Sequence, residues 1–126
     1  MVKRYLAEAG AEQVRNAMGA DERWFVSRVA YTETLGALIR DVGEADASTQ
    51  AFKDEWALFD IIDLTQEVVA RAADLVGGAG LRSLDAVHLS SALIVPRGDM
   101  LFATWDRRLW RAARDRDLRL LPAEEP

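Results

Sequence analysis

The 126-residue chain contains no cysteine and a single histidine, His88. Without cysteine there are no disulfides and no thiolate ligands, and one histidine excludes the usual zinc sites built from several imidazoles. Any metal ion would therefore be held by oxygen atoms. Carboxylate and water oxygens are the preferred ligands of Mg²⁺ and Mn²⁺, so these are the cations that the composition favours.

Long apolar runs are also lacking. No stretch of about 18 apolar residues could cross a membrane, and no charged start precedes an apolar segment as it does in a secretory signal. We therefore expect a soluble, cytoplasmic protein with no membrane partner. With 21 acidic and 16 basic residues, the chain has a net charge of −5. That balance excludes a polycation that coats nucleic acid without specificity, so any nucleic-acid contact must be local.

The length and the hydrophobic content of 50% fit one domain, over residues 1–126, with one core. Short apolar runs alternate with longer helical periodicities, which is typical of an α/β layer fold with a mainly parallel sheet. The pattern predicts strands near 23–27, 60–64, 100–104 and 118–121. It predicts helices over 2–7, 11–18, 28–41, 47–58, 66–76, 83–95 and 107–115.

Three acidic residues lie where these elements meet. Asp85 is in the first turn of an otherwise apolar helix, Asp106 directly follows a strand, and Glu33 lies in the second turn of the helix after another strand. In parallel sheets the ligand crevice lies outside the carboxyl ends of the strands. Three acids at such junctions suggest an oxygen-bound metal site.

Each acid also has a simpler interpretation. Asp85 favours the helix dipole from the first turn, and Asp106 is a suitable N-cap. Glu33 could be a surface residue paired with Arg40 or Arg28. Taken singly, none of the three establishes a site.

Several neighbours of these acids are better explained by structure than by chemistry. His88 is expected to be a hydrogen-bonded core or rim residue rather than a catalytic base. Thr104 and Ser27, each at a strand end, are expected to satisfy nearby backbone or carboxylate groups. The tryptophans are expected in the core or an interface, except that Trp105, at the predicted crevice, could contact a substrate base or a partner.

The segment from Leu101 to Arg119 is locally basic, with six arginines against three aspartates. A basic face beside an acidic pocket suits a phosphodiester substrate.

Together these motifs resemble the PIN-domain family, and within it the VapC-type ribonuclease toxins of VapBC toxin–antitoxin modules. The resemblance spans nearly the whole chain. Its carriers are Val2-Lys-Arg-Tyr-Leu-Ala-Glu8, the helix of Glu33, the run Gly80-Leu-Arg-Ser-Leu-Asp-Ala-Val-His-Leu-Ser-Ser-Ala-Leu93, and Phe102-Ala-Thr-Trp-Asp-Arg-Arg-Leu109 followed by Ala112-Ala113.

The resemblance implies a three-layer α/β/α fold and a metal-dependent endoribonuclease whose clustered acids hold Mg²⁺ or Mn²⁺. Glu33, Asp85 and Asp106 match three of the family's acidic positions, and Thr104 matches its hydroxyl residue. Such a protein would cut RNA and would form a homodimer, or a heterotetramer or larger assembly with a VapB-like antitoxin. Further contacts, to phosphate or within the fold, would come from Arg82, Arg107 and Arg108.

One departure from the family concerns its first strand, which is central in a sheet of order 3-2-1-4-5 and ends in an Asp-containing turn. No counterpart of that strand or its Asp precedes Val2, so the chain is expected to be an N-terminally incomplete PIN-like domain. We hypothesise a truncated form or a misassigned start codon, with impaired metal binding.

Two other functions are considered. A degenerate PIN-like module could dimerise and capture an antitoxin without cutting RNA. A phospho-receiver domain is also an acidic α/β unit that binds magnesium, but it needs a lysine near the end of a late strand. With lysines only at 3 and 53, the chain lacks that residue.

Overall fold

The computed structural model describes residues 1–96, 98 and 100–126. The chain forms two compact units, Met1–Ile61 and Ile62–Pro126, and each is described by itself.

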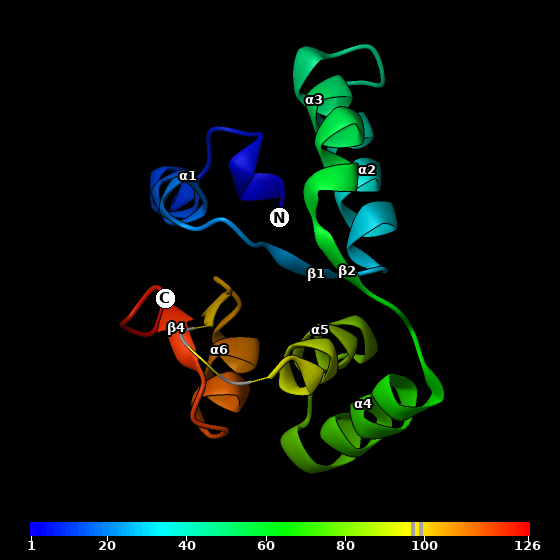
Figure 1. The fold of residues 1–126 in the computed structure, drawn as a ribbon, viewed down its shortest axis with the longest axis vertical. Helices are drawn as coiled ribbons and strands as arrows, with labels where there is room; N and C mark the ends of the chain where they lie inside the picture. The colour runs from blue at the N-terminus through cyan, green and yellow to red at the C-terminus, as the bar shows by residue number, and fades with distance from the viewer. Residues whose placement is uncertain (97, 99) are drawn as a thin grey trace. The chain divides into compact units, whose positions relative to one another are not determined.

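The first unit is mainly helical (Figure 1). It begins with a 3₁₀ turn, η1, and its helices α2 and α3 pack side by side. Asp46 caps α3 by accepting a hydrogen bond from the Ser48 amide at 2.8 Å. In chain order the elements are η1 Val2–Arg4, α1 Ala11–Ala20, β1 Phe25–Ser27, α2 Ala30–Asp41, α3 Ala47–Glu55, η2 Trp56–Leu58 and β2 Asp60–Ile62, the last reaching the start of the second unit.

An aromatic cluster holds the first unit together. Phe52 is fully buried, and its ring lies 5.4 Å from Tyr5, 5.6 Å from Tyr31 and 5.7 Å from Trp56, measured between centroids. The rings meet edge-on or tilted, the arrangements that aromatic quadrupoles favour. Leu38, also fully buried, extends this core along α2.

The second unit packs three helices against two strands. Thr65 caps α4, which continues through Gly77 and Gly78 until Gly80 ends it in the left-handed conformation at φ 62°. That conformation is open to glycine without a steric penalty. The elements are α4 Gln66–Ala79, α5 Ser83–Ile94, β3 Leu101–Ala103, α6 Arg107–Arg114 and β4 Arg119–Leu121.

The core of this unit lies between α4, α5 and α6. Ala86, Leu89 and Ala113 are fully buried at its centre. The hydroxyl of Ser90 on α5 donates to the Val68 carbonyl on α4 at 2.8 Å, so a polar group at this helix pair is satisfied. The rest of the cluster consists of Ala72, Leu75, Leu81, Leu109 and Ala112.

The strands form two separate pairs among the described residues, β1 with β2 and β3 with β4. β3 and β4 are parallel, with Leu101 opposite Arg119 and Ala103 opposite Leu121, which confirms the expected parallel pairing. Leu101 and Ala103 are exposed, so β3 lacks the two-sided cover of a buried parallel strand. This arrangement agrees with the α/β class expected from the sequence.

Most predicted elements are confirmed, with differences at their ends. The helix expected over 2–7 is only the 3₁₀ turn η1, because the chain turns again before Gly10, which adopts φ 86°. Arg82 is the N-cap of α5, without a side-chain cap.

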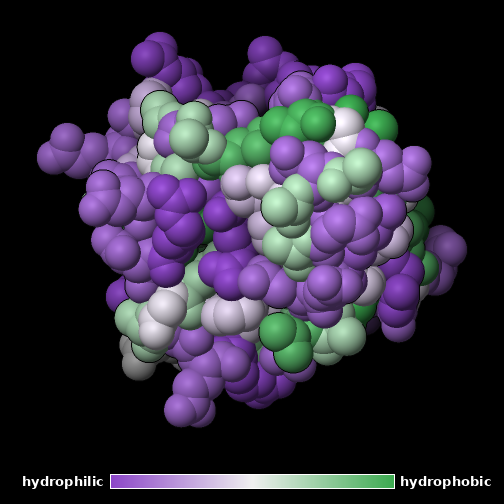
Figure 2. Space-filling view, turned by 90° about the horizontal axis from the view of Figure 1, so that it is seen from above, coloured by the Kyte–Doolittle hydropathy of each residue, from purple (hydrophilic) through white to green (hydrophobic). Residues whose placement is uncertain are grey.

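The surface is mostly polar. Figure 2 shows a face covered largely by hydrophilic residues, with hydrophobic ones in separate patches. In the described part of the chain, no helix is long and apolar enough to span a lipid bilayer.

Candidate active site

Asp85 lies in the first turn of α5, as predicted. Its side chain is largely buried, 19% exposed, and Oδ2 accepts a hydrogen bond from Nε of Arg82 at 2.8 Å. Arg82 is the residue just before the helix. The arginine three positions earlier is the sequence signal for this contact, because positions i and i+3 are neighbours at a helix start.

Asp106 is the N-cap of α6, as the simpler interpretation of the sequence predicted. Its Oδ1 accepts from the Leu109 amide at 2.9 Å at the start of α6. Thr104 in turn accepts from the Asp106 amide at 3.2 Å, and its own amide donates to the Leu121 carbonyl at 2.9 Å. Thr104 therefore satisfies backbone groups, as expected, and fixes the turn that carries Asp106.

The capping bond leaves the second oxygen of Asp106 available. Oδ2 of Asp106 lies 2.8 Å from Nη2 of Arg82, the same guanidinium that binds Asp85. One arginine thus brings two of the three predicted acids to one place in the second unit. Its hydrogen bond to Asp85, and then the charges of Asp85 and Asp106, raise the pKa of Arg82.

The donor set suits a hard divalent cation. Two carboxylate oxygens directed at one cationic group, with water completing the coordination shell, are what Mg²⁺ takes from many proteins. Among residues 1–96, 98 and 100–126, no three acidic or histidine side chains are close enough together to hold a metal ion. The structure brings two of the predicted acids together, Asp85 and Asp106, through Arg82.

Glu33 lies on α2 in the first unit and is exposed. Burial lowers the pKa of the Met1 amino group, and the charge of Glu33 opposes that shift, so the two groups lie near each other. Asp85 and Asp106 belong to the second unit. Convergence of Glu33 with them remains a prediction.

Other residues at the predicted crevice have structural contacts. Arg107 donates to the Pro126 carbonyl, and Nη1 of Arg108 donates to the Gly80 carbonyl at 3.2 Å. His88 and Trp105 are half-buried. Ser27 is a correction: its hydroxyl is buried at the end of β1 but has no hydrogen-bond partner among the described residues, so it does not satisfy a neighbouring group.

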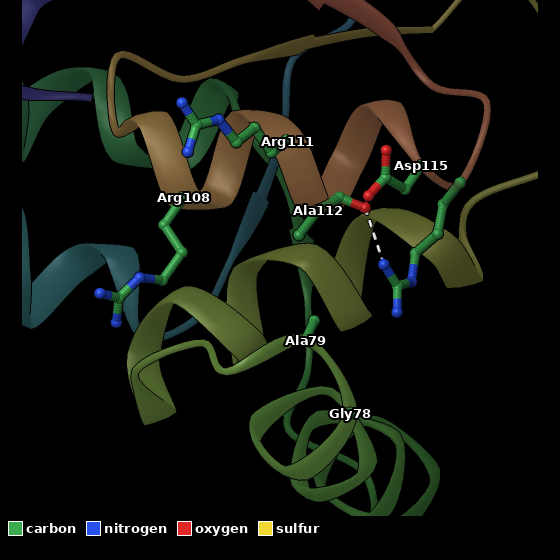
Figure 3. Close-up of a pocket in the computed structure, with 7 residues that line it drawn as sticks. Gly78, Ala79, Arg108, Arg111, Ala112 and Asp115 are labelled. Atoms are coloured by element: carbon green, nitrogen blue, oxygen red, sulfur yellow. Dashed lines mark hydrogen bonds between the residues drawn. The ribbon is translucent and has the colours of Figure 1, made fainter.

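An arginine-rich depression of about 650 Å³ lies between α6 and the C-terminal end of α4 (Figure 3). Arg108 and Arg111, three residues apart on α6, both line it, and their guanidinium groups extend away from each other. Arg116 donates to the Ala112 carbonyl at 2.8 Å. The basic character of this segment was predictable from the sequence, but the grouping of these arginines around one depression was not. The lining residues are Gly78, Ala79, Arg108, Arg111, Ala112, Asp115 and Arg116.

Comparison with known proteins shows the family of the chain. The family model described as "PIN domain" matches residues 2–115. The chain belongs to the PIN domain family. This PIN domain is 32% identical over 130 residues to Ribonuclease VapC45 and to Ribonuclease VapC49 of Mycobacterium tuberculosis, covering 98% of the chain and 90% of each relative.

A third relative is Ribonuclease VapC47 of the same species, at 38% identity over 90 residues, which covers 68% of the chain and 65% of that protein. These likenesses make the chain a VapC-type PIN domain. No solved structure matches it.

Proposed function

We propose that this PIN domain is a divalent-metal-dependent endoribonuclease, the toxin of a type II toxin–antitoxin module, and that it acts with Mg²⁺ or Mn²⁺. The observation that carries the proposal is the pair of Oδ2 atoms, from Asp85 and Asp106, each 2.8 Å from the Arg82 guanidinium. The likeness to three proteins named as VapC ribonucleases supports it.

Each residue then has a role. Asp85 and Asp106 would hold the cation, and Glu33 is the third predicted ligand. When bound, the cation neutralises phosphate charge and lowers the pKa of a coordinated water. Thr104 is a positioning residue, because it holds the backbone N–H of Asp106.

The arginines of the second unit suit the polyanionic substrate. The Arg82 side chain is 70% exposed, so it is free to turn from the carboxylates to a phosphate oxygen, which guanidinium groups bind well. Arg108, with the depression of Figure 3, offers positive charge to the flanking phosphates. Arg107 adds to this charge from the first turn of α6.

The proposal includes partners. We expect a homodimer, and a heterotetramer or larger assembly with a VapB-like antitoxin, in the cytoplasm where the RNA substrate is found. Light scattering after size-exclusion chromatography, with and without the co-expressed antitoxin, measures both states.

A second candidate is a catalytically inactive PIN-like module that dimerises and binds an antitoxin. The observation that favours it is again Arg82, which neutralises the two acids that a metal ion needs.

Cleavage of a labelled single-stranded RNA in Mg²⁺ or Mn²⁺ tests the proposal. We expect EDTA and Asp85→Asn each to abolish cutting, and Asp74→Asn, an exposed acid on α4, to leave it unchanged. Cleavage that is unchanged both by EDTA and by Asp85→Asn contradicts the proposed metal-dependent ribonuclease. No cleavage by the unmodified chain, together with tight antitoxin binding, supports the inactive module.

A further inference from the structure

A second groove, of about 400 Å³, lies in the first unit at the start of α2 and the end of α3. It has no part in the acidic site described above. Tyr31 and Thr32 come from the first turn of α2, and Trp56 begins η2 directly after α3. The complete lining is Arg28, Tyr31, Thr32, Lys53 and Trp56, and we call it the Tyr31–Trp56 groove.

The aromatic side chains of this groove, Tyr31 and Trp56, are held in place by packing. The rings of Tyr31 and Trp56 are 5.0 Å apart between centroids, at 65° to each other. Both rest on Phe52, which is fully buried. Tyr31 and Trp56 are only half-buried, so they present ordered aromatic surface to a ligand at little entropic cost.

The charge at the groove is positive. Arg28 and Lys53 line it, and no acidic residue does. Nζ of Lys53 lies 3.4 Å from Oε1 of Glu44, whose side chain is 73% exposed. A long ion pair at the surface contributes little, so Lys53 keeps its attraction for an anionic ligand.

Aromatic faces beside cations are the combination that single-stranded nucleic acid requires. Bases stack on aromatic rings whatever their sequence, and basic side chains contact the backbone. Thr32 adds a hydroxyl that can donate to or accept from a base edge. We propose that the Tyr31–Trp56 groove binds a nucleobase of single-stranded RNA, with the neighbouring phosphate on Lys53 or Arg28.

This inference rests on the proposed function and specifies how that substrate is held. Thr32 immediately precedes Glu33, so the groove adjoins the helix turn that carries a predicted catalytic acid. A peptide is the less suitable occupant, because the lining offers two cations and no aliphatic side chain to an apolar segment.

Binding measured without cleavage tests the groove. The anisotropy of a labelled 12-nucleotide RNA is followed in EDTA, beside an oligonucleotide of the same backbone with abasic positions. We expect the base-bearing RNA to bind at least about fivefold more tightly, given typical base–aromatic stacking. Tyr31→Leu should bring this ratio close to one, while Tyr31→Phe, which keeps the ring, should preserve it.

The basic side chains of the groove should have a different effect on RNA binding from that of the aromatic rings. Lys53→Gln should weaken the binding of both oligonucleotides alike and flatten the salt dependence. Arg71→Gln, an exposed arginine paired with Glu67 on α4, is the matched control and should change binding less. An unchanged base-to-abasic ratio in Tyr31→Leu overturns the proposal. So does a loss of antitoxin affinity in that variant with RNA binding intact, because it makes the groove a protein-docking site.

A second measurement does not depend on how well the variants fold. RNA carrying 5-iodouridine is photo-crosslinked to the unmodified protein, and the adducts are mapped by mass spectrometry. Adducts on Tyr31 or Trp56 support the groove. Adducts confined to other aromatics, such as the half-buried Trp24 of the same unit, overturn it. Base preference without any cleavage refutes the ribonuclease and not the groove, whereas cleavage without base preference refutes only the groove.

Discussion

Nη2 of Arg82 and Oδ2 of Asp106 lie 2.8 Å apart, although 24 residues separate them in the chain. The contact joins the start of α5 to the cap of α6, and Asp85 shares the same guanidinium. Arg82 would therefore compete with the proposed cation for the two carboxylates.

Removing this competitor should improve metal binding. In Arg82→Gln, the dissociation constant for Mn²⁺ measured by titration calorimetry should fall by roughly two- to tenfold, the range expected for losing exposed ion pairs. RNA cleavage should fall at the same time, because the guanidinium no longer contacts phosphate. Arg71→Gln is the control. Weaker Mn²⁺ binding in Arg82→Gln would show that the arginine supports the metal site instead of competing for it.

Two substitutions of Asp106 separate its capping from its chemistry. Asn caps helices about as well as Asp, so Asp106→Asn should leave the free energy of unfolding nearly unchanged while abolishing cleavage. Asp106→Ala should cost about 1 kcal/mol as well, through loss of the bond to the Leu109 amide. Urea unfolding and the RNA assay measure the two effects. Full activity in Asp106→Asn would mean that Asp106 only caps α6 and has no role in cleavage.

For Asp85 and Asp106, the local contacts were predictable from the sequence and the long-range contact was not. The Asp106 cap was predictable because a cap depends on residues within three positions. The position of Asp85 was predictable because helix periodicity and the glycine stop before α5 are local signals. The bond from Arg82 to Asp106 was not, since it depends on how α5 and α6 pack around Leu89 and Ala113. No local pattern encodes that packing.

The same distinction between local and long-range contacts explains the other differences between the predicted and the observed structure. The six residues assigned to the first helix are too few to sustain one alone, and in the structure the side chains of Arg4 and Tyr5 bind Glu55, about 50 residues away. The resemblance to PIN domains supplied the order of the strands, which the short apolar runs could not. It also placed Glu33 with the other two acids, a prediction that periodicity alone does not make.

Two glycines of the α4 region should respond in opposite directions to alanine. An added Cβ meets no atom within 4 Å at either Gly77 or Gly80, so only the backbone decides. Gly77→Ala, within the helix, should stabilise the protein by about 0.5–1 kcal/mol. Gly80→Ala, at φ 62°, should destabilise it by about 1–2 kcal/mol. Thermal unfolding measures both, and equal effects would contradict the left-handed cap.

Leu89 and Leu84 on α5 form a matched pair for the core of the second unit. Leu89 is fully buried and Leu84 is 47% exposed. Leu89→Ala should lower the free energy of unfolding by about 2–5 kcal/mol, through lost burial and the cavity left behind. Leu84→Ala should change it by no more than about 0.5 kcal/mol. A similar cost at both positions would mean that α5 does not pack as described.

Because of Glu55, the stability of the first unit should depend on pH in the acidic range. Its carboxylate accepts from Nε and Nη2 of Arg4 at 2.8 and 3.1 Å, and from the Tyr5 hydroxyl at 2.8 Å. The hydrogen bond from Arg4 is the main reason why the pKa of Glu55 is lowered. Partial burial opposes the shift, and the Tyr5 hydrogen bond adds to it. A lowered pKa means that the folded state binds this proton less readily than the unfolded state.

The stabilisation from Glu55 is therefore fully present above the ordinary glutamate pKa of about 4.3 and is lost as the pH falls through the lower value of the folded state. Glu55→Gln should be less stable than the unmodified chain at pH 7, and the difference should shrink between about pH 5 and pH 3. Urea midpoints across this range measure it. Glu67→Gln, which alters an exposed pair on α4, is the control and should show a nearly constant difference. A gap for Glu55→Gln that stays the same down to pH 3 would mean that Arg4 and Tyr5 do not hold a charged carboxylate in the folded protein.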